Sequence, residues 1–308
     1  MNGRINSSKN YVLLTPCKNE GHNLLYLIES VVSQTIRPVL WVIVDDCSDD
    51  NTPQIIKEVI EKFDWIKVLR LEEKNKRDLG LHLAEITKKG FNFCIQYCMQ
   101  KGIEYNYFGN VDADLTFDNT FFENLISEFE KDLELGVASG GIILTISGRF
   151  VYVKGLPIDE PSGGDMLIRR RCFEECGGIP QSYAYDTVLK AKARLKGWKT
   201  KRFEENLAIE VRDVGSAEGY FKGFMQMGVT SQYLNLHPIH VFARGIFKSL
   251  RKPYYGGIIY IISYLYCHLK RDSQIKDIEI RNYYWNKWKQ VYKKRLSSRV
   301  IHEVVGQK

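Results

Sequence analysis

Two aspartates separated by one residue, Asp112 and Asp114, form the most chemically suggestive pair in the sequence. They follow a short aromatic and β-branched run, Tyr107–Val111, which predicts a buried strand, and period-two geometry places both carboxylates on one side of its extended end. Two oxygen donors so placed suit a divalent cation that grips the diphosphate of a nucleotide. Aspartate also commonly follows strands as a turn former or helix cap, so the pair alone leaves both interpretations open.

The elements around this pair predict an α/β protein. Buried strands are predicted where apolar residues run together, and helices where apolar residues recur at helical spacing. The strands are expected at residues 11–15, 39–44, 66–71, 137–141 and 150–153, and the helices at residues 24–32, 56–63, 91–101, 121–129 and 188–195. Strand and helix alternate in the first part, which predicts right-handed βαβ units and a Rossmann-like, mostly parallel sheet flanked by helices.

Three polar residues fall at or just past the carboxyl ends of separate predicted strands: Thr15, Asp46 and Asp112. Ligands of open parallel sheets bind at these ends, so the three side chains are expected to converge on one crevice. No GxGxxG follows the first strand, and the chain has no GxxxxGK[ST] motif, which argues against a dinucleotide fold and a P-loop. Nucleotide binding would therefore depend on carboxylates and a metal ion.

The charge of the chain is unevenly distributed. The 308 residues carry a net charge of +7, yet residues 242–308 hold 15 Lys and Arg against 4 Asp and Glu, and the rest hold 29 against 33. We therefore predict a catalytic domain over residues 1–241 and a helical, basic and aromatic C-terminal region over residues 242–308. Residues 1–10 are polar and carry no secretory signal, so a cytoplasmic location is expected.

The C-terminal region contains an apolar and aromatic run of 16 residues, Tyr254–Leu269, with Arg251-Lys252 before it and Lys270-Arg271 after it. It is shorter than the roughly 20 residues of a spanning helix. A buried core helix and a segment in a membrane interface both remain open, and the basic flanks favour the interface. The basic and aromatic residues would also suit nucleic acid, but no recognisable nucleic-acid module accompanies them, so an anionic membrane surface is the expected partner.

The seven cysteines do not predict a disulfide framework, because they are odd in number and scattered. Cys94 and Cys98, like Cys172 and Cys176, are four residues apart, and no CxxC motif or neighbouring histidine suggests zinc. They are predicted to be core thiols in a reducing compartment.

Four motifs carry a family resemblance: TPCKNE, VIVDDCSDDNT, VDADLTFD and GGDMLIRRRCFEECGG, in this order and at these intervals. Together they resemble the nucleotide-sugar-binding domain of glycosyltransferase family 2, with the A-type glycosyltransferase fold, over about Tyr11–Gly219. The resemblance implies that Asp112 and Asp114 hold Mg²⁺ or Mn²⁺ with the nucleoside diphosphate. It also implies that Asp46 hydrogen-bonds the base and that Thr15, Glu20 and Asp112 belong to the nucleotide pocket.

The same resemblance implies an inverting displacement, with Asp186 as the base that accepts the proton of the acceptor hydroxyl. A plain helix cap is the alternative role for Asp186. Asp165 and Gly164 fall where relatives bind the acceptor or donor sugar, with a simple turn as the alternative.

Two positions depart from the family pattern. Tyr185 stands where many relatives have an acid before the base. Glu210 stands where many have a histidine, which makes it a further candidate metal ligand, and Arg212 is placed to contact phosphate. No QxxRW motif follows, which indicates a non-processive enzyme.

The sequence therefore predicts a hexosyltransferase-like enzyme that uses a UDP-sugar or GDP-sugar donor and a glycan or lipid-linked acceptor at the cytoplasmic face of a membrane. Synthesis of cell-surface polysaccharide, glycolipid or glycoprotein glycans would be its setting. A catalytically silent scaffold that binds nucleotide sugar is the alternative, motivated by Tyr185 and Glu210. A sugar-nucleotide pyrophosphorylase would need a glycine-rich loop after the first strand, and the TPCKNE segment at that place contains no glycine. Oligomeric state is not determined by the sequence.

Overall fold

The structure is a computed structural model that describes residues 9–72, 80–146, 148–153, 156–213, 219–250 and 252–289. The chain divides into two compact units, residues 1–214 and 215–308. The domain boundary predicted from charge, at residue 241, falls instead inside the helix Pro238–Ser249 of the second unit. The charge changes where basic residues begin, whereas the packing changes where the sheet ends.

The described part of the first unit contains a nine-stranded sheet. Its strands are β1 (Tyr11–Cys17), β2 (Leu40–Asp45), β3 (Ile66–Arg70), β4 (Tyr107–Val111), β5 (Leu115–Phe117), β6 (Leu135–Ile146), β7 (Arg149–Tyr152), β8 (Asp165–Arg169) and β9 (Lys199–Asp213). The order is β3-β2-β1-β4-β8-β6-β9-β5, with β7 paired to β6. The pairs β3-β2, β2-β1 and β1-β4 are parallel, and β8 enters antiparallel to both β4 and β6.

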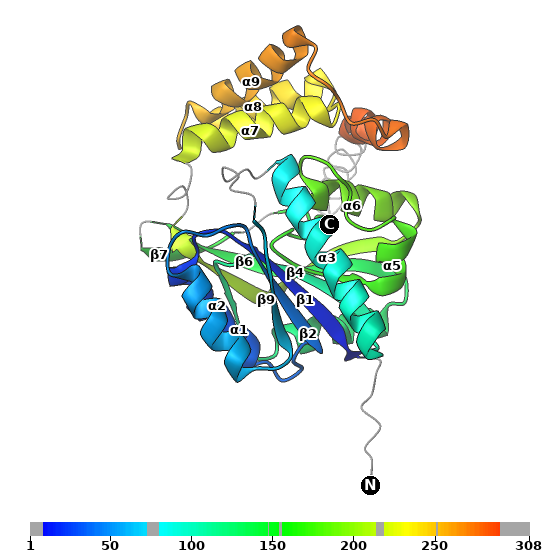
Figure 1. Cartoon of the computed structure of the whole chain (residues 1–308). Helices are drawn as coiled ribbons and strands as arrows, with labels where there is room; N and C mark the ends of the chain where they lie inside the picture. Colours follow the sequence, from blue (N-terminus) through cyan, green and yellow to red (C-terminus); the bar gives the residue numbers. More distant parts are fainter. Residues whose placement is uncertain are drawn as a thin grey trace, which may run out of the picture. The chain divides into compact units, whose positions relative to one another are not determined.

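Helices cover both faces of this sheet (Figure 1). One face carries α1 (Gly21–Val32), α2 (Thr52–Lys62) and α4 (Phe121–Lys131), and the other carries α3 (Leu81–Lys101), α5 (Arg170–Glu175) and α6 (Tyr185–Leu195). Each face has its own buried apolar cluster. The second cluster includes Cys94, Cys98, Cys172 and Cys176, so these thiols pack in the core.

The structure corrects the predicted boundaries of α3 and β1, among others. Helix α3 begins at Leu81, ten residues before the predicted start at Phe91. Its first part packs through small residues, since a Cβ added at Gly90 would lie 2.4 Å from Leu14 Cδ1, and apolar periodicity does not detect such a contact. Strand β1 runs through Pro16 to Cys17. Pro16 lies beyond Leu14, the last residue of β1 that pairs with β4, where a missing N–H breaks no ladder.

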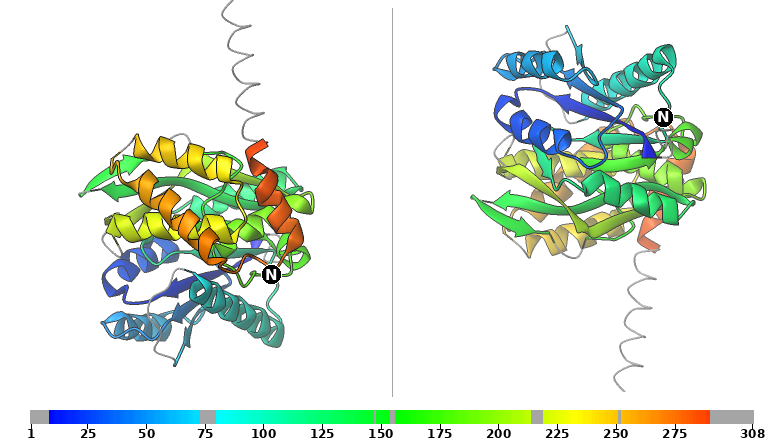
Figure 2. Two further views of the ribbon diagram at one scale, coloured as in Figure 1. Left: turned by 90° about the horizontal axis from the view of Figure 1, so that it is seen from above. Right: turned by 90° about the horizontal axis from the view of Figure 1, so that it is seen from below.

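The second unit contains α7 (Gly219–Tyr233), α8 (Pro238–Ser249), α9 (Gly256–Lys270) and a helix over residues 278–289. Helix α9 packs against both α7 and α8 (Figure 2, left). Helices α8 and α9 approach through glycines, because a Cβ added at Gly257 would lie 1.9 Å from Gly245 O. Among the described helices, none combines the length and the apolar character needed to cross a membrane.

Candidate active site

A glycine loop passes between two of the predicted acids at the carboxyl end of β4. The backbone N–H of Asp112 donates to Gly164 O at 2.8 Å. A Cβ added at Gly164 would lie 2.4 Å from Asp112 Oδ2, and one added at Gly163 would lie 2.6 Å from Asp186 Oδ2. Glycine at both positions therefore lets the loop fit between Asp112, at the end of β4, and Asp186, in the first turn of α6.

The segment from Asp112 to Asp114 is a turn, not the extended strand end that period-two geometry predicted. The N–H of Leu115 approaches Asp112 O at 3.4 Å, which closes the turn. Strand β5 then pairs antiparallel with β9, Leu115 opposite Glu210, and the N–H of Val211 donates to Asp114 O at 2.8 Å. This pairing, rather than the spacing of the aspartates, brings β9 beside Asp114.

Arg212 of β9 is bound by two of the predicted site acids. Its Nε donates to Asp114 Oδ2 at 2.8 Å, and its guanidinium also pairs with Glu20 Oε1. Glu20 is buried after β1 and accepts a second hydrogen bond, from Asn23 Nδ2 at 2.8 Å. In this structure the arginine that was expected to contact phosphate links the β1–α1 connection to the Asp114 turn.

The carboxylates near Arg212 outnumber it: they are Glu20, Asp112, Asp114 and Glu210. Crowding by protein atoms, followed by repulsion from Asp114 and Glu210, raises the pKa of Asp112 to about 8, although its side chain keeps solvent access at the rim. Burial and repulsion from Asp114, opposed by Arg212, raise the pKa of Glu210 to about 7. Both carboxyls therefore lie in uncompensated negative charge.

This cluster suits a divalent cation in its chemistry, because its groups are carboxylate oxygens with excess negative charge. Within the described ranges, however, no three His, Cys, Asp or Glu side chains converge closely enough to hold a metal ion. Asp114 is engaged by Arg212 instead.

Asp186 has the opposite electrostatic setting. It lies in the first turn of α6, whose N-cap Ala184 adopts a left-handed φ of 47°. Lys190 Nζ donates to Asp186 Oδ2 at 2.8 Å. Burial works against ionisation, but the Lys190 ammonium outweighs it and holds the pKa of Asp186 below its ordinary value. The Asp186 side chain remains 24% exposed. It is therefore an ionised, accessible carboxylate.

The neighbouring Tyr185 belongs to the core. Its side chain is buried in the apolar cluster that packs α3 and α6 against the sheet. The position that carries an acid in many relatives thus serves packing between α6, α3 and β4 in this chain.

Asp46 has two partners that sequence reasoning missed. Its Oδ1 lies 3.0 Å from His82 Nε2, and its Oδ2 accepts from Lys18 Nζ at 3.1 Å. Lys18 lies inside the TPCKNE motif, so it carried a sequence signal. His82 had none, because it lies in the part of α3 that periodicity did not predict.

Two other predicted residues are fully buried. Thr15 lies within β1, and its Oγ1 accepts from Trp41 Nε1 at 3.0 Å. Asp165 begins β8, and its Oδ2 accepts the Gly140 N–H at 2.8 Å. Burial raises the pKa of Asp165 to about 6. Asp165 thus holds the glycine loop against β6, and contact of either residue with a ligand stays a prediction.

Residues 12–184 match the sequence profile described as Glycosyl transferase family 2, more than half of the chain. The chain belongs to glycosyl transferase family 2. The family recognised from the four motifs is therefore confirmed. A sequence comparison with curated proteins finds no match.

Solved structures confirm the A-type glycosyltransferase fold of this family 2 member. The mannosyltransferase PcManGT from Pyrobaculum calidifontis, in complex with GDP-Man and Mn²⁺, superposes with a TM-score of 0.53 at 16% identity, covering 83% of this chain and 69% of that one. GalNAc-T7 with UDP, GalNAc and Mn²⁺ superposes with a TM-score of 0.50 at 16% identity, covering 70% of this chain and 47% of that one. This chain thus spans about half the length of GalNAc-T7.

Proposed function

We propose that this chain is an inverting, non-processive glycosyltransferase that moves one sugar from a UDP-sugar or GDP-sugar to a glycan or lipid-linked acceptor beside a membrane. The observation that carries the proposal is the pair of acids on either side of the Gly163-Gly164 loop. Asp112 belongs to an uncompensated acid cluster, and Asp186 is an accessible, ionised carboxylate.

Asp186 acts as the general base in this proposal. The acceptor oxygen forms a bond to the anomeric carbon as its proton passes to the Asp186 carboxylate, and the bond from that carbon to the diphosphate oxygen breaks. Attack opposite the leaving group inverts the anomeric configuration. General-base assistance of this kind is worth about 10² to 10⁴ in rate.

The acid cluster takes the donor side. Asp112 and Asp114 would hold Mg²⁺ or Mn²⁺, with Glu210 as a third ligand, and Arg212 would exchange its contacts with Asp114 and Glu20 for the diphosphate. When bound, the ion neutralises the departing diphosphate. Presence of Mn²⁺ in both similar structures supports this assignment. We assign Thr15, Glu20 and Asp46 to the nucleotide side, with Asp46 beside the base, and the Gly164-Asp165 segment to the sugar.

Thermal unfolding with UDP and with GDP, each with and without Mn²⁺, tests donor binding. A ligand at 100 times its dissociation constant stabilises a protein by about 2.7 kcal/mol, enough to move the midpoint by several degrees. We expect a manganese-dependent shift with one of the two nucleotides. The anomeric configuration of the product, read by NMR, then tests inversion, and a retained configuration would contradict the role of Asp186.

The second candidate function is a catalytically silent scaffold that binds nucleotide sugar. The engagement of Asp114 by Arg212 and the core role of Tyr185 favour it. Sugar transfer or slow donor hydrolysis by the wild type, lost in Asp186→Asn, would exclude the scaffold.

We also propose that the second unit attaches the enzyme to the cytoplasmic face of a membrane. In helix α9 the distribution of side chains is the opposite of that in an ordinary surface helix, because aliphatic residues lie on its exposed side. Two of its tyrosines point inward, with Tyr260 Oη 2.9 Å from Ser231 Oγ and Tyr264 Oη donating to Leu236 O at 3.0 Å, whereas Tyr266 is exposed. Its aliphatic residues point outward, since Ile262 is 59% and Leu269 82% exposed.

Helix α8 has a similar exposed aliphatic stripe, in which Ile246 is 60% and Leu250 70% exposed. Lys252 precedes α9, and Lys270 and Arg271 end it. Exposed aliphatic stripes with basic flanks match the chemistry of an anionic lipid surface: the aliphatic side chains enter the interface, and the ammonium and guanidinium groups meet lipid phosphates.

Co-sedimentation with vesicles of anionic and of neutral lipid tests this attachment. We expect binding to the anionic vesicles that weakens as salt rises and is lost in Ile262→Glu. Leu133→Glu is the matched control, since Leu133 is 74% exposed in the first unit. Equal binding by Ile262→Glu and wild type would assign the α9 stripe to another role.

A further inference from the structure

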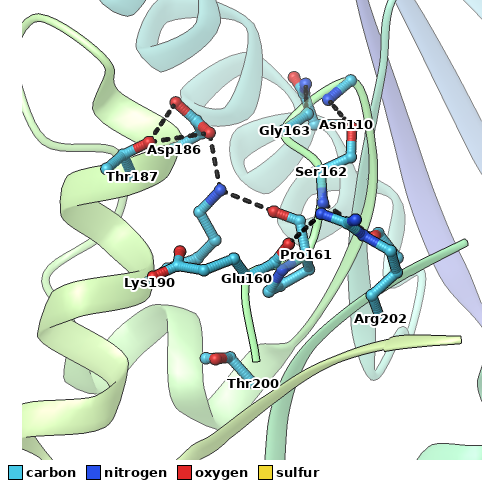
Figure 3. Close-up of polar contacts among 12 residues, drawn as sticks. Asn110, Glu160, Pro161, Ser162, Gly163, Asp186, Thr187, Lys190, Thr200 and Arg202 are labelled. Carbon is cyan, nitrogen blue, oxygen red and sulfur yellow. Dashed lines mark hydrogen bonds and ion pairs between the residues drawn. The ribbon is translucent and has the colours of Figure 1, made fainter. Parts of the chain in front are cut away.

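Basic side chains from α6 and β9 hold the loop that precedes Gly163 and Gly164 (Figure 3). Lys190 Nζ donates to Pro161 O at 2.7 Å, and Arg194 Nη1 pairs with Glu160 Oε1 at 3.0 Å. Arg202 donates to Glu160 O. This loop is therefore held by three cations before it passes between Asp112 and Asp186.

Lys190 differs from the two arginines because it also contacts the proposed base. Its Nζ donates to Asp186 Oδ2 at 2.8 Å as well as to Pro161 O, so one ammonium joins the carboxylate to the loop. Its side chain is only 5% exposed. A lysine is rarely buried to this extent without charged or polar partners, and here both partners belong to the candidate site.

The contact distinguishes the two oxygens of the Asp186 carboxylate. Lys190 Nζ and the Cα of Gly163 both lie against Oδ2, and a side chain at position 163 would collide with it. Thr187 Oγ1 approaches both oxygens at long distance, 3.5 Å from Oδ1 and 3.4 Å from Oδ2, and the Thr187 N–H also hydrogen-bonds the carboxylate. The short contact with Lys190 therefore holds Oδ2 more tightly than Oδ1, and Oδ1 is the oxygen oriented toward a substrate proton.

We propose that Lys190 is a positioning residue of the transfer reaction: it fixes Asp186 Oδ2 against the Pro161–Gly164 loop and so orients Oδ1 toward the acceptor hydroxyl. This inference rests on the proposed function of Asp186. It also couples the base to the loop, since one ammonium holds both. A displacement of about 1 Å at such a group can cost on the order of 10² in rate.

The charged and titratable groups around Asp186 come from two elements. Lys190 and Tyr185 lie on α6 itself, and Asp112 faces it from the end of β4 across the glycine loop. Among these groups Lys190 is the cation, and the Thr187 N–H and hydroxyl also favour the ionised form through hydrogen bonds. Loss of Lys190 therefore leaves Asp186 beside Asp112 with no counter-charge.

The test compares Lys190→Met, Lys190→Arg and Arg194→Met in sugar-transfer kinetics over a range of pH. On the high-pH plateau of each kcat profile, where the base is ionised in both proteins, we expect Lys190→Met to lower kcat by about tenfold or more with the donor KM unchanged. The acid limb of its kcat profile should move up by about one pH unit or more. Lys190→Arg should restore the limb, and Arg194→Met, which loses a loop anchor one turn away, should leave the limb in place.

An unchanged plateau kcat, or equal movement of the acid limb in Lys190→Met and Arg194→Met, would overturn the inference. The ¹³C titration of the Asp186 carboxyl in the wild type covers the case in which Lys190→Met does not fold. A pKa at or above the ordinary value of about 3.9 would also overturn it. Absence of transfer by the wild type would refute the proposed function, whereas the titration would still decide whether Lys190 holds Asp186.

Discussion

The two sides of the Gly163-Gly164 loop contain the same kind of group in opposite electrostatic states. On one side, Arg212 pairs with Asp114 and Glu20, and the neighbouring Asp112 and Glu210 have raised pKa values. On the other side, Asp186 has its own cation, Lys190, and its pKa is lowered.

The difference shows how carboxylates in one site can serve two roles, cation binding and proton acceptance. A cluster short of positive charge attracts a cation and the phosphates that accompany it. A carboxylate with its own ammonium stays ionised and can accept a proton. The local ratio of acids to cations separates the two roles, because both sides use the same kind of group, a carboxylate.

The largest expected effect separates Asp186 from an ordinary helix-capping acid. Asp186→Asn should lower kcat by about 10² to 10⁴ and leave the donor dissociation constant unchanged, because the amide cannot accept the proton. Glu123, an acid in the first turn of α4, supplies the control Glu123→Gln. Steady-state kinetics and donor titration give both quantities. Similar activity of the two variants would reduce Asp186 to a cap.

Asp165 separates the effect of burial from that of repulsion, because burial is the main cause of its raised pKa. The folded protein holds this proton more tightly than the unfolded chain does. The stabilisation is therefore complete below about pH 4, and on the order of 2–3 kcal/mol is lost as pH rises through 6. Asp165→Asn should flatten the fall in the unfolding free energy between pH 4 and 7, measured by denaturant titration. An unchanged slope would mean that Asp165 titrates normally.

Asp114→Ala tests the acid cluster as the donor side. The variant should lose the manganese-dependent stabilisation by nucleotide, about 2.7 kcal/mol at 100 times the dissociation constant, because the remaining acids no longer complete the cation site. Asp186→Asn should retain it. Asp114→Ala is therefore expected to lose nucleotide binding, whereas Asp186→Asn is expected to lose turnover. Thermal unfolding with and without Mn²⁺ provides the measurement, and a full shift in Asp114→Ala would move the cation elsewhere.

The smallest expected effect concerns Glu210. Its folded pKa of about 7 is raised, so its stabilising contribution is present below about pH 4 and is lost as pH rises through 7. In metal-free buffer, Glu210→Gln should reduce the change of the thermal midpoint with pH between pH 5 and 8. It should also lower the pKa of Asp112, because one source of repulsion is removed. If the midpoint varies with pH as in the wild type, Glu210 does not contribute to the cluster.

Much of this fold could be predicted from local patterns. The strands β1 and β2 were predictable because each is a continuous apolar run that is buried almost throughout, and the helices α1, α2 and α4 because each buries apolar residues at helical spacing. Four motifs in order identified the family. The prediction missed the part of helix α3 before Phe91, because small residues such as Ala84 and Gly90 form its buried side there.

The sequence by itself determined which acids gather at the carboxyl ends of the strands, since strand ends and motifs are local properties. It also contained the four-residue spacing of Asp186 and Lys190, which one helix turns into an ion pair. Only the tertiary structure decided that Arg212 lies between Asp114 and Glu20, that Asp46 meets His82, and that Lys190 also reaches Pro161. Each of these contacts joins segments far apart in the chain, and it is fixed by strand pairing and packing, which no local pattern records.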